Sequence, residues 1–286
     1  MLKFYNSLIN ILFLIILIFL SEYLYSKDLF DSEFYEISFT SNNIEDDKVN
    51  IISDLKIKSF ENILEKTLIK SDFKIIEKKL NSDFVNLFVK NIIIEDEKIV
   101  NDYYYSKIKI NFIKKNIINY FRKNKFPYVE FLPKEMLTII LENNKIYRNL
   151  FSENNLHYKY LLNNKSDNTF FRLPNLDVND RYILTFQDIE NKKINKLNNF
   201  SKKYSFKDTI LIIVKQEQNT SIYDVYLIEN NNLKKINIDH NKYKDLKDLF
   251  LNIKYQVINQ WKIKNKIQND QINKINCSIK DRKSVV

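Results

Sequence analysis

The sequence contains no glycine, and this absence limits the backbone more than any other feature of the chain. Glycine normally occupies the left-handed region of backbone space and lets a backbone approach a phosphate closely. A Walker-type phosphate loop, a dinucleotide-binding glycine motif and a nucleophile elbow are therefore excluded in recognisable form. Asparagine is the next residue that accepts left-handed backbone. We therefore expect turns at the Asn-rich positions 42–43, 143–144, 163–164 and 230–232.

The basic character of the chain does not predict a nucleic-acid partner. The formal net charge is +10, but the lysines are spread along the whole chain and alternate with acidic residues. Nucleic-acid binding needs a concentrated basic face. The single cysteine, Cys277, excludes an internal disulfide. We expect Cys277 to be a buried structural residue and His157 and His240 to lie on the surface, so that no catalytic pair, metal site or cofactor site is predicted.

The N-terminus has the organisation of a secretory signal. Lys3 is followed by an apolar run at residues 11–20 (ILFLIILIFL) and then by the polar segment SEYLYSKD. This run is shorter than the ~20 residues that span a bilayer. Two outcomes stay open, namely cleavage after Ser26 and retention of residues 1–26 as a membrane anchor. Either way, the rest of the chain is expected in the periplasm, released or held at the inner membrane.

The remaining pattern predicts an α+β protein in which helices pack on small, mostly antiparallel sheets, after the N-terminal signal helix. An acidic loop at residues 42–50 precedes a helix at 54–70, capped by Ser53 or Asp54. Strands are expected at 128–131, 136–141 and 209–214, the last forming a parallel pair if it returns beside an earlier strand. The predicted organisation is a first α+β module (27–142), a linker (143–168) and a second α/β module (169–286). The abrupt end of the second module at Val286 suggests a truncation there.

One stretch, NIIIEDEKIVNDYYYSKIKINFI at residues 91–113, concentrates most of the chemistry in the chain. It predicts a β-hairpin, with the acids near the end of one strand or in the turn and the tyrosines opening the next strand. Three adjacent acids on an extended chain cannot face one point, so a metal site is not predicted. An aromatic surface for a partner is the functional interpretation. Its candidate partner-binding residues are Tyr103, Tyr104 and Tyr105.

The order of these segments resembles a proteobacterial secreted family known as domain of unknown function two thousand and sixty-six. The likeness is carried by NILEKTLIKSDFKIIEKKL, LFVKNIIIEDEKIVNDYYYSKIKINFI, NIINYFRKNKFPYVEF and LTIILENNKIYRNL. It implies a helix packed on a hairpin whose first strand ends in Asp96-Glu97. At the level of fold, similar modules occur in the amino-terminal domain of the Tol-Pal translocation protein, in outer-membrane activators of peptidoglycan synthases and in the flagellar T protein. These proteins bind partners, and the resemblance implies no catalytic residue.

These observations lead to the hypothesis of an exported, non-enzymatic envelope protein that binds another envelope protein. One alternative is a hydrolase that acts on an envelope carbohydrate with paired carboxylates. Its candidate residues are Glu95, Asp96, Glu97, Asp177 and Asp180. Another alternative is the same binding module held in the inner membrane by residues 1–26.

Overall fold

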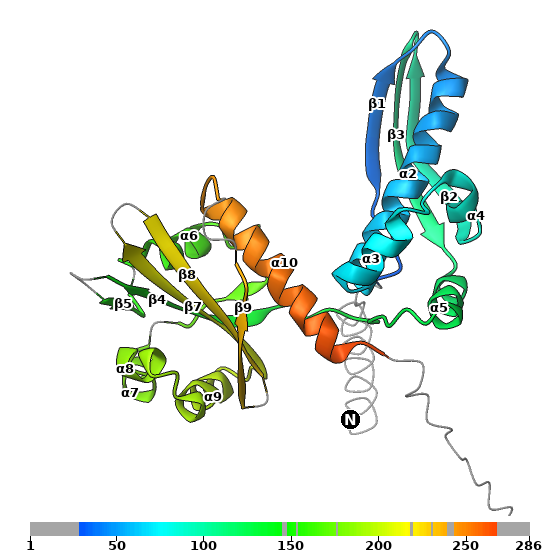
Figure 1. The fold of residues 1–286 in the computed structure, drawn as a ribbon. Coiled ribbons are helices and arrows are strands. Elements are labelled where there is room, and N and C mark those ends of the chain that lie inside the picture. The colour runs from blue at the N-terminus through cyan, green and yellow to red at the C-terminus, as the bar shows by residue number, and fades with distance from the viewer. Residues whose placement is uncertain are drawn as a thin grey trace, which may run out of the picture. The chain divides into compact units, whose positions relative to one another are not determined.

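The computed structural model describes residues 29–144, 148–152, 154–175, 177–217, 220–229, 231–238 and 243–267. The predicted signal segment, His240 and Cys277 lie outside these ranges. The chain divides into two compact units, with the boundary between Phe126 and Pro127. Both units combine helices with small sheets, so the α+β class is confirmed (Figure 1). No helix within the described ranges combines the length and the apolar character needed to cross a bilayer.

The first unit is a three-stranded antiparallel sheet in the order β1-β3-β2, with a long helix along one face (Figure 1). Phe60 of that helix lies against Phe88 and Phe112, with ring centroids 4.8 and 5.5 Å apart. The elements are β1 (Tyr35–Thr40), α2 (Ile44–Thr67), α3 (Lys70–Glu77), α4 (Ser82–Asn86), β2 (Val89–Val100), β3 (Tyr103–Phe112) and α5 (Lys114–Lys123).

The acidic loop predicted at residues 42–50 is wrong, because helix α2 already begins at Ile44. The side chain of Asn43 accepts a hydrogen bond from the backbone N–H of Asp46 and so caps the helix. Three acidic residues follow in the first turn, where the positive end of the helix dipole stabilises negative charge. The same residues therefore start the helix that they were expected to precede.

The second unit is built on a sheet in the order β5-β4-β7-β8-β9, with β6 also paired to β4. Strands β4 and β7 are parallel, as the sequence suggested for one pair, and β7, β8 and β9 are antiparallel neighbours. The elements are β4 (Met136–Asn143), β5 (Arg148–Leu150), α6 (Leu156–Asn163), β6 (Phe171–Arg172), α7 (Asp180–Ile183), α8 (Phe186–Glu190), α9 (Ile194–Lys203), β7 (Asp208–Glu217), β8 (Thr220–Glu229), β9 (Asn232–Ile236) and α10 (Leu246–Asn265).

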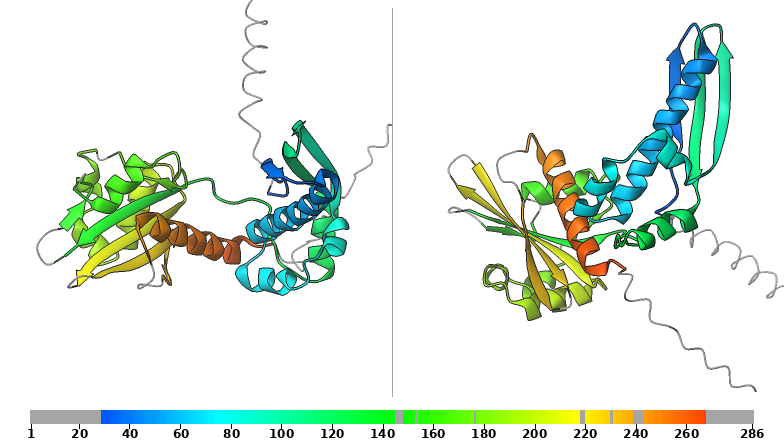
Figure 2. Two further views of the ribbon diagram at one scale, coloured as in Figure 1. Left: turned by 90° about the horizontal axis from the view of Figure 1, so that it is seen from above. Right: turned by 45° about the vertical axis from the view of Figure 1, so that its right-hand side comes forward.

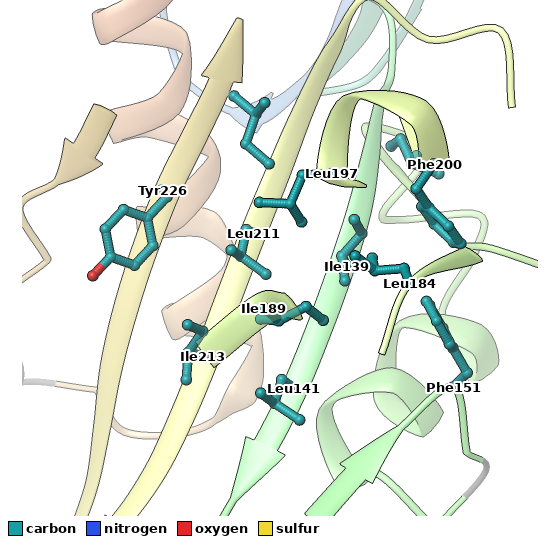
Figure 3. Packing of buried hydrophobic residues seen from close by; sticks show 12 residues of the cluster. Ile139, Leu141, Phe151, Leu184, Ile189, Leu197, Phe200, Leu211, Ile213 and Tyr226 are labelled. Atoms are coloured by element: carbon teal, nitrogen blue, oxygen red, sulfur yellow. The ribbon is translucent and has the colours of Figure 1, made fainter. Parts of the chain in front are cut away.

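Helices cover both faces of this second sheet, whereas the sequence predicted helices on one face. Helix α10 crosses one face, and α7, α8 and α9 lie on the other (Figures 1 and 2). Leu197 and Phe200 of α9 meet Leu211 and Ile139 in the core on the α9 side (Figure 3). Strand β4 is buried from Met136 to Glu142, because a strand between two helical layers has no solvent face.

The predicted domain boundary and linker are wrong. Strand β4 was assigned to the first module, but it pairs with β7 over Leu137 to Asn143 and so belongs to the second unit. The expected linker at 143–168 contains β5 and α6. Residues 128–131, expected as a strand, form none, and Tyr128 makes only an isolated antiparallel bridge with Ile267.

Left-handed backbone falls mostly outside the predicted asparagine turns. In the described residues, positive φ angles occur at seven non-glycine positions, and only Asn231 belongs to a predicted turn. The seven are Asp96, Asn101, Lys125, Phe151, Lys192, Ser205 and Asn231. Lys125, Lys192 and Ser205 each directly follow the C-cap of a helix. Glycine would ordinarily occupy these positions.

The end of α9 shows how the chain builds this motif without glycine. The backbone N–H of Phe206 donates to the carbonyl of Ser201, and the N–H of Ser205 donates to that of Lys202. These two bonds define a Schellman motif, which requires left-handed backbone at Ser205, where φ is 61°. Each non-glycine residue in this conformation costs ~1 kcal/mol or more through crowding of its Cβ.

Replacing Ser205 with glycine is expected to stabilise the second unit by about 0.5–1 kcal/mol, because glycine removes this crowding. Urea unfolding followed by the fluorescence of Trp261, the only tryptophan, measures the change. Lys202→Gly, at an exposed helical position of α9, is the matched control and is expected to destabilise by about 0.5–1 kcal/mol. Unfolding of Ser205→Gly at lower urea than the parent would contradict the motif.

Asp224 on β8 makes the stability of the second sheet depend on pH in the acidic range. Its carboxylate lies 2.8 Å from Lys215 Nζ and 2.6 Å from Lys235 Nζ. Burial raises the pKa of Asp224, but hydrogen bonds from the two ammonium groups outweigh it and lower the pKa to about 2. The carboxylate is therefore more acidic in the folded state than in the unfolded chain.

Acid is expected to weaken the second unit through this group. A lowered folded pKa gives stability that is present above the unfolded pKa and is lost as the pH falls toward about 2. We expect a loss of about 1–2 kcal/mol from Asp224 between roughly pH 5 and pH 2. Urea unfolding at several pH values measures the slope. Asp224→Asn should flatten it, and equal slopes in variant and parent would refute the assignment.

Candidate functional site

The three consecutive tyrosines of β3 do not form one surface. Successive side chains of a strand point to opposite faces. Tyr104 faces helix α2 and is fully buried, with its ring 5.0 Å from that of Phe39. Tyr103 lies on the outer face and is 44% exposed, and Tyr105 lies there half-buried. The prediction of Tyr104 as a partner-binding residue is therefore wrong, while Tyr103 and Tyr105 remain candidates.

The acidic cluster lies within strand β2 at a bulge, and not in the hairpin turn. Glu95 pairs with Lys107 and Lys98 pairs with Tyr105, so β2 holds one more residue than β3 between these pairs. Asp96 has a φ of 54°, the left-handed backbone that such a bulge often needs. The turn itself consists of Asn101 and Asp102.

The bulge sends the acidic side chains to different partners. Asp96 pairs with Lys107 on the neighbouring strand at 2.9 Å. Glu97 Oε1 accepts a hydrogen bond from Lys48 Nζ of α2 at 2.6 Å and another from Tyr104 Oη at 2.8 Å. The acids therefore do not converge. Across the described residues, no group of three or more His, Cys, Asp and Glu side chains could hold a metal ion.

Glu97, Lys48 and Tyr104 form a cluster that ties helix α2 to the hairpin. The hydrogen bonds from Lys48 and Tyr104 lower the pKa of Glu97. Burial raises the pKa of Tyr104, so its hydroxyl remains a donor at neutral pH. The ammonium of Lys48 also lies 5.6 Å from the centre of the Tyr104 ring.

The outer face of the first sheet carries aromatic, aliphatic and basic side chains. The register places Val100 opposite Tyr103 and Lys98 opposite Tyr105. Val100 is 62% exposed. Helix α2 lies along the other face (Figure 1). Eight outer-face residues of β2 and β3, from the turn end of the hairpin inward, are Ile93, Glu95, Lys98, Val100, Tyr103, Tyr105, Lys107 and Lys109. We call this set the tyrosine face.

The two other acidic candidates lie together in the second unit, and both contact Lys203. Lys203 Nζ is 2.6 Å from Asp180 Oδ1 and 3.4 Å from Asp177 Oδ2. Tyr204 Oη donates to Asp180 Oδ2 at 2.5 Å. Burial, followed by this hydrogen bond, raises the pKa of Tyr204 to about 12. The fully buried Asp180 thus joins α7 to α9, which is a structural role.

The structure also brings together a polar cluster that the sequence did not indicate. His157, expected on the surface, is only 7% exposed. Its ring Nδ1 lies 2.7 Å from Glu142 Oε1, and its Nε2 lies 3.4 Å from Tyr223 Oη. Burial raises the pKa of Glu142, but the hydrogen bonds from His157 outweigh this effect and the net shift is downward.

This cluster depends on tertiary structure. Glu142 and Tyr223 are both opposite Val214, on the two sides of β7, and His157 of α6 reaches across that strand. The only sequence signal was a carboxylate that ends an apolar run at Glu142. The arrangement orients the imidazole, with Glu142 and His157 buried and Tyr223 half-buried in the second unit. No protein-family model matches the chain, and neither does any curated protein sequence.

Replacing Tyr104 with phenylalanine is expected to loosen the hairpin by about 1 kcal/mol, because it removes the hydrogen bond to Glu97 but keeps the buried ring. Hydrogen–deuterium exchange of peptides from β2 and β3 measures the change as faster exchange. Tyr103→Phe is the matched control, since no hydrogen bond of the Tyr103 hydroxyl is present in the described structure. Equal exchange in both variants would show that the Glu97 cluster does not hold the hairpin.

Proposed function

We propose that the chain is an exported, non-catalytic protein of the cell envelope that binds another envelope protein through the tyrosine face. The observation that carries this proposal is the placement of Tyr103 and Tyr105 beside exposed Val100 on a sheet face opposite α2. Tyrosine is enriched at protein interfaces because it supplies a large contact area with few rotatable bonds. The apolar run at residues 11–20 supports export.

Charge on the tyrosine face favours a partner with acidic groups at its rim. Lys98, Lys107 and Lys109 lie in the rows that flank the tyrosines. Lys107 is already paired with Asp96, and Glu95 of the same face lies opposite Lys107. Lys98 and Lys109 therefore contribute the attraction, against the one carboxylate of Glu95. Complementary charge speeds association and fixes orientation more than it adds affinity. Affinity would come from the aromatic and aliphatic side chains.

The carboxylate-dependent hydrolase has less support. Four of its five candidate acids accept a hydrogen bond or ion pair from a lysine, and the two groups of acids lie in different units. The resemblance to secreted modules that bind partners also favours binding over hydrolysis, because that resemblance implies no catalytic residue. In the membrane-held alternative, residues 1–26 are retained and the tyrosine face serves the same role.

Site-specific photocrosslinking in cells tests the proposal. Benzoylphenylalanine at position 105, in a chain tagged after Val286, is expected to capture one envelope protein reproducibly. The matched control is the same probe at Tyr182, which is 78% exposed in the second unit and is expected to capture none of it. Adding Tyr103→Ser to the position-105 probe should reduce the yield at least several-fold. Equal capture from positions 105 and 182, or none from 105 in folded and abundant protein, would overturn the proposal.

A further inference from the structure

The second unit contains a cavity of about 500 Å³ that no step of the proposed function uses. This volume is within the range of small-molecule sites. The cavity is formed by α6, the turn after it, β6 and the segment that follows β6, with Glu135 before β4 at its rim. It therefore lies within one compact unit.

The floor of the cavity is apolar and held in place. Phe171 and Leu173 are buried, and Leu162 is half-buried beside them. Tyr158, also in the lining, donates a hydrogen bond from its hydroxyl to the carbonyl of Pro174 at 2.8 Å. The base of the cavity is thus a set of packed side chains that would bury apolar atoms of a ligand at little cost in ordering.

The rim adds an excess of positive charge. Arg172 and Lys165 both line the cavity and are exposed, and Glu135 is the only acid in the lining. Within the described residues, neither cation makes an ion pair. Two cations and one carboxylate give the rim of the cavity a net charge of +1. A guanidinium also presents donors in the planar arrangement that a carboxylate accepts in pairs.

We propose that this cavity binds a small amphipathic monocarboxylate, with its apolar chain on the Leu162–Phe171–Leu173 floor and its carboxylate at Arg172 and Lys165. One negative charge matches the net charge of the rim. The apolar floor distinguishes this ligand from inorganic anions, which would gain nothing from it. The site is independent of the tyrosine face, which belongs to the other unit.

Isothermal titration with octanoate tests the proposal, with octan-1-ol and octylammonium as neutral and cationic probes of equal chain length. Octanoate is expected to bind saturably and at least fivefold more tightly than octanol, and octylammonium more weakly than both. Arg172→Gln should weaken octanoate binding at least fivefold, and Leu162→Trp should abolish it by filling the cavity. Lys159→Gln, an exposed charge change on α6 outside the lining, should leave affinity unchanged.

The outcomes separate the proposal from general attraction to a basic protein. An equal loss in Lys159→Gln and Arg172→Gln would show attraction by net charge only and would overturn the site. The absence of saturable octanoate binding, or equal binding of all three probes, would also overturn it. Circular dichroism confirms that each variant is folded. Because Arg172→Gln alters only an exposed side chain, the test remains decisive if Leu162→Trp does not fold.

Discussion

A bulge of one residue at Asp96 determines which face of the first sheet each nearby side chain occupies. In an unbroken register, Glu97 would lie opposite Tyr105 on the outer face. The extra residue turns Glu97 toward α2, where Lys48 and Tyr104 bind it. Lys98 then takes the place opposite Tyr105. The same local feature therefore anchors the helix to the hairpin and places an ammonium group, instead of a carboxylate, directly opposite Tyr105.

The lack of glycine explains where this chain places conformational strain. Left-handed backbone is still required at strand bulges and helix ends, and residues such as Asp96, Lys125 and Ser205 adopt it. Two hydrogen bonds at each helix end outweigh the crowding of one Cβ. Strain of this kind is spread over both units and does not mark a site by itself. Side-chain hydrogen bonds add stability elsewhere in each unit. Glu97 and Asp180 each accept hydrogen bonds from a lysine and a tyrosine and so hold separate elements together.

Local pattern predicted the features that depend on neighbours in sequence. The pattern of residues 91–113 predicted the hairpin of β2 and β3, and strands were predicted at 136–141 and 209–214, where β4 and β7 lie. The start of α2 was missed because acidic residues suit both a loop and the first turn of a helix. The parallel pairing of β4 with β7 joins residues about 70 positions apart, which no local pattern records. For the same reason the sequence could not show that His157 is buried against Glu142, or that a bulge in β2 turns Glu97 toward α2 and Lys98 outward.

Disulfide trapping of the register at the bulge tests the central claim most directly. In a Cys277→Ser background, the pair Lys98→Cys and Tyr105→Cys should form a disulfide readily, because directly opposite residues have Cβ atoms about 4.5–5.5 Å apart. Glu97→Cys with Tyr105→Cys should not form one, since those side chains lie on opposite faces. Preferential trapping of the Glu97–Tyr105 pair would show an unbroken register. That result would place Glu97 on the outer face and contradict the account of both the helix anchor and the tyrosine face.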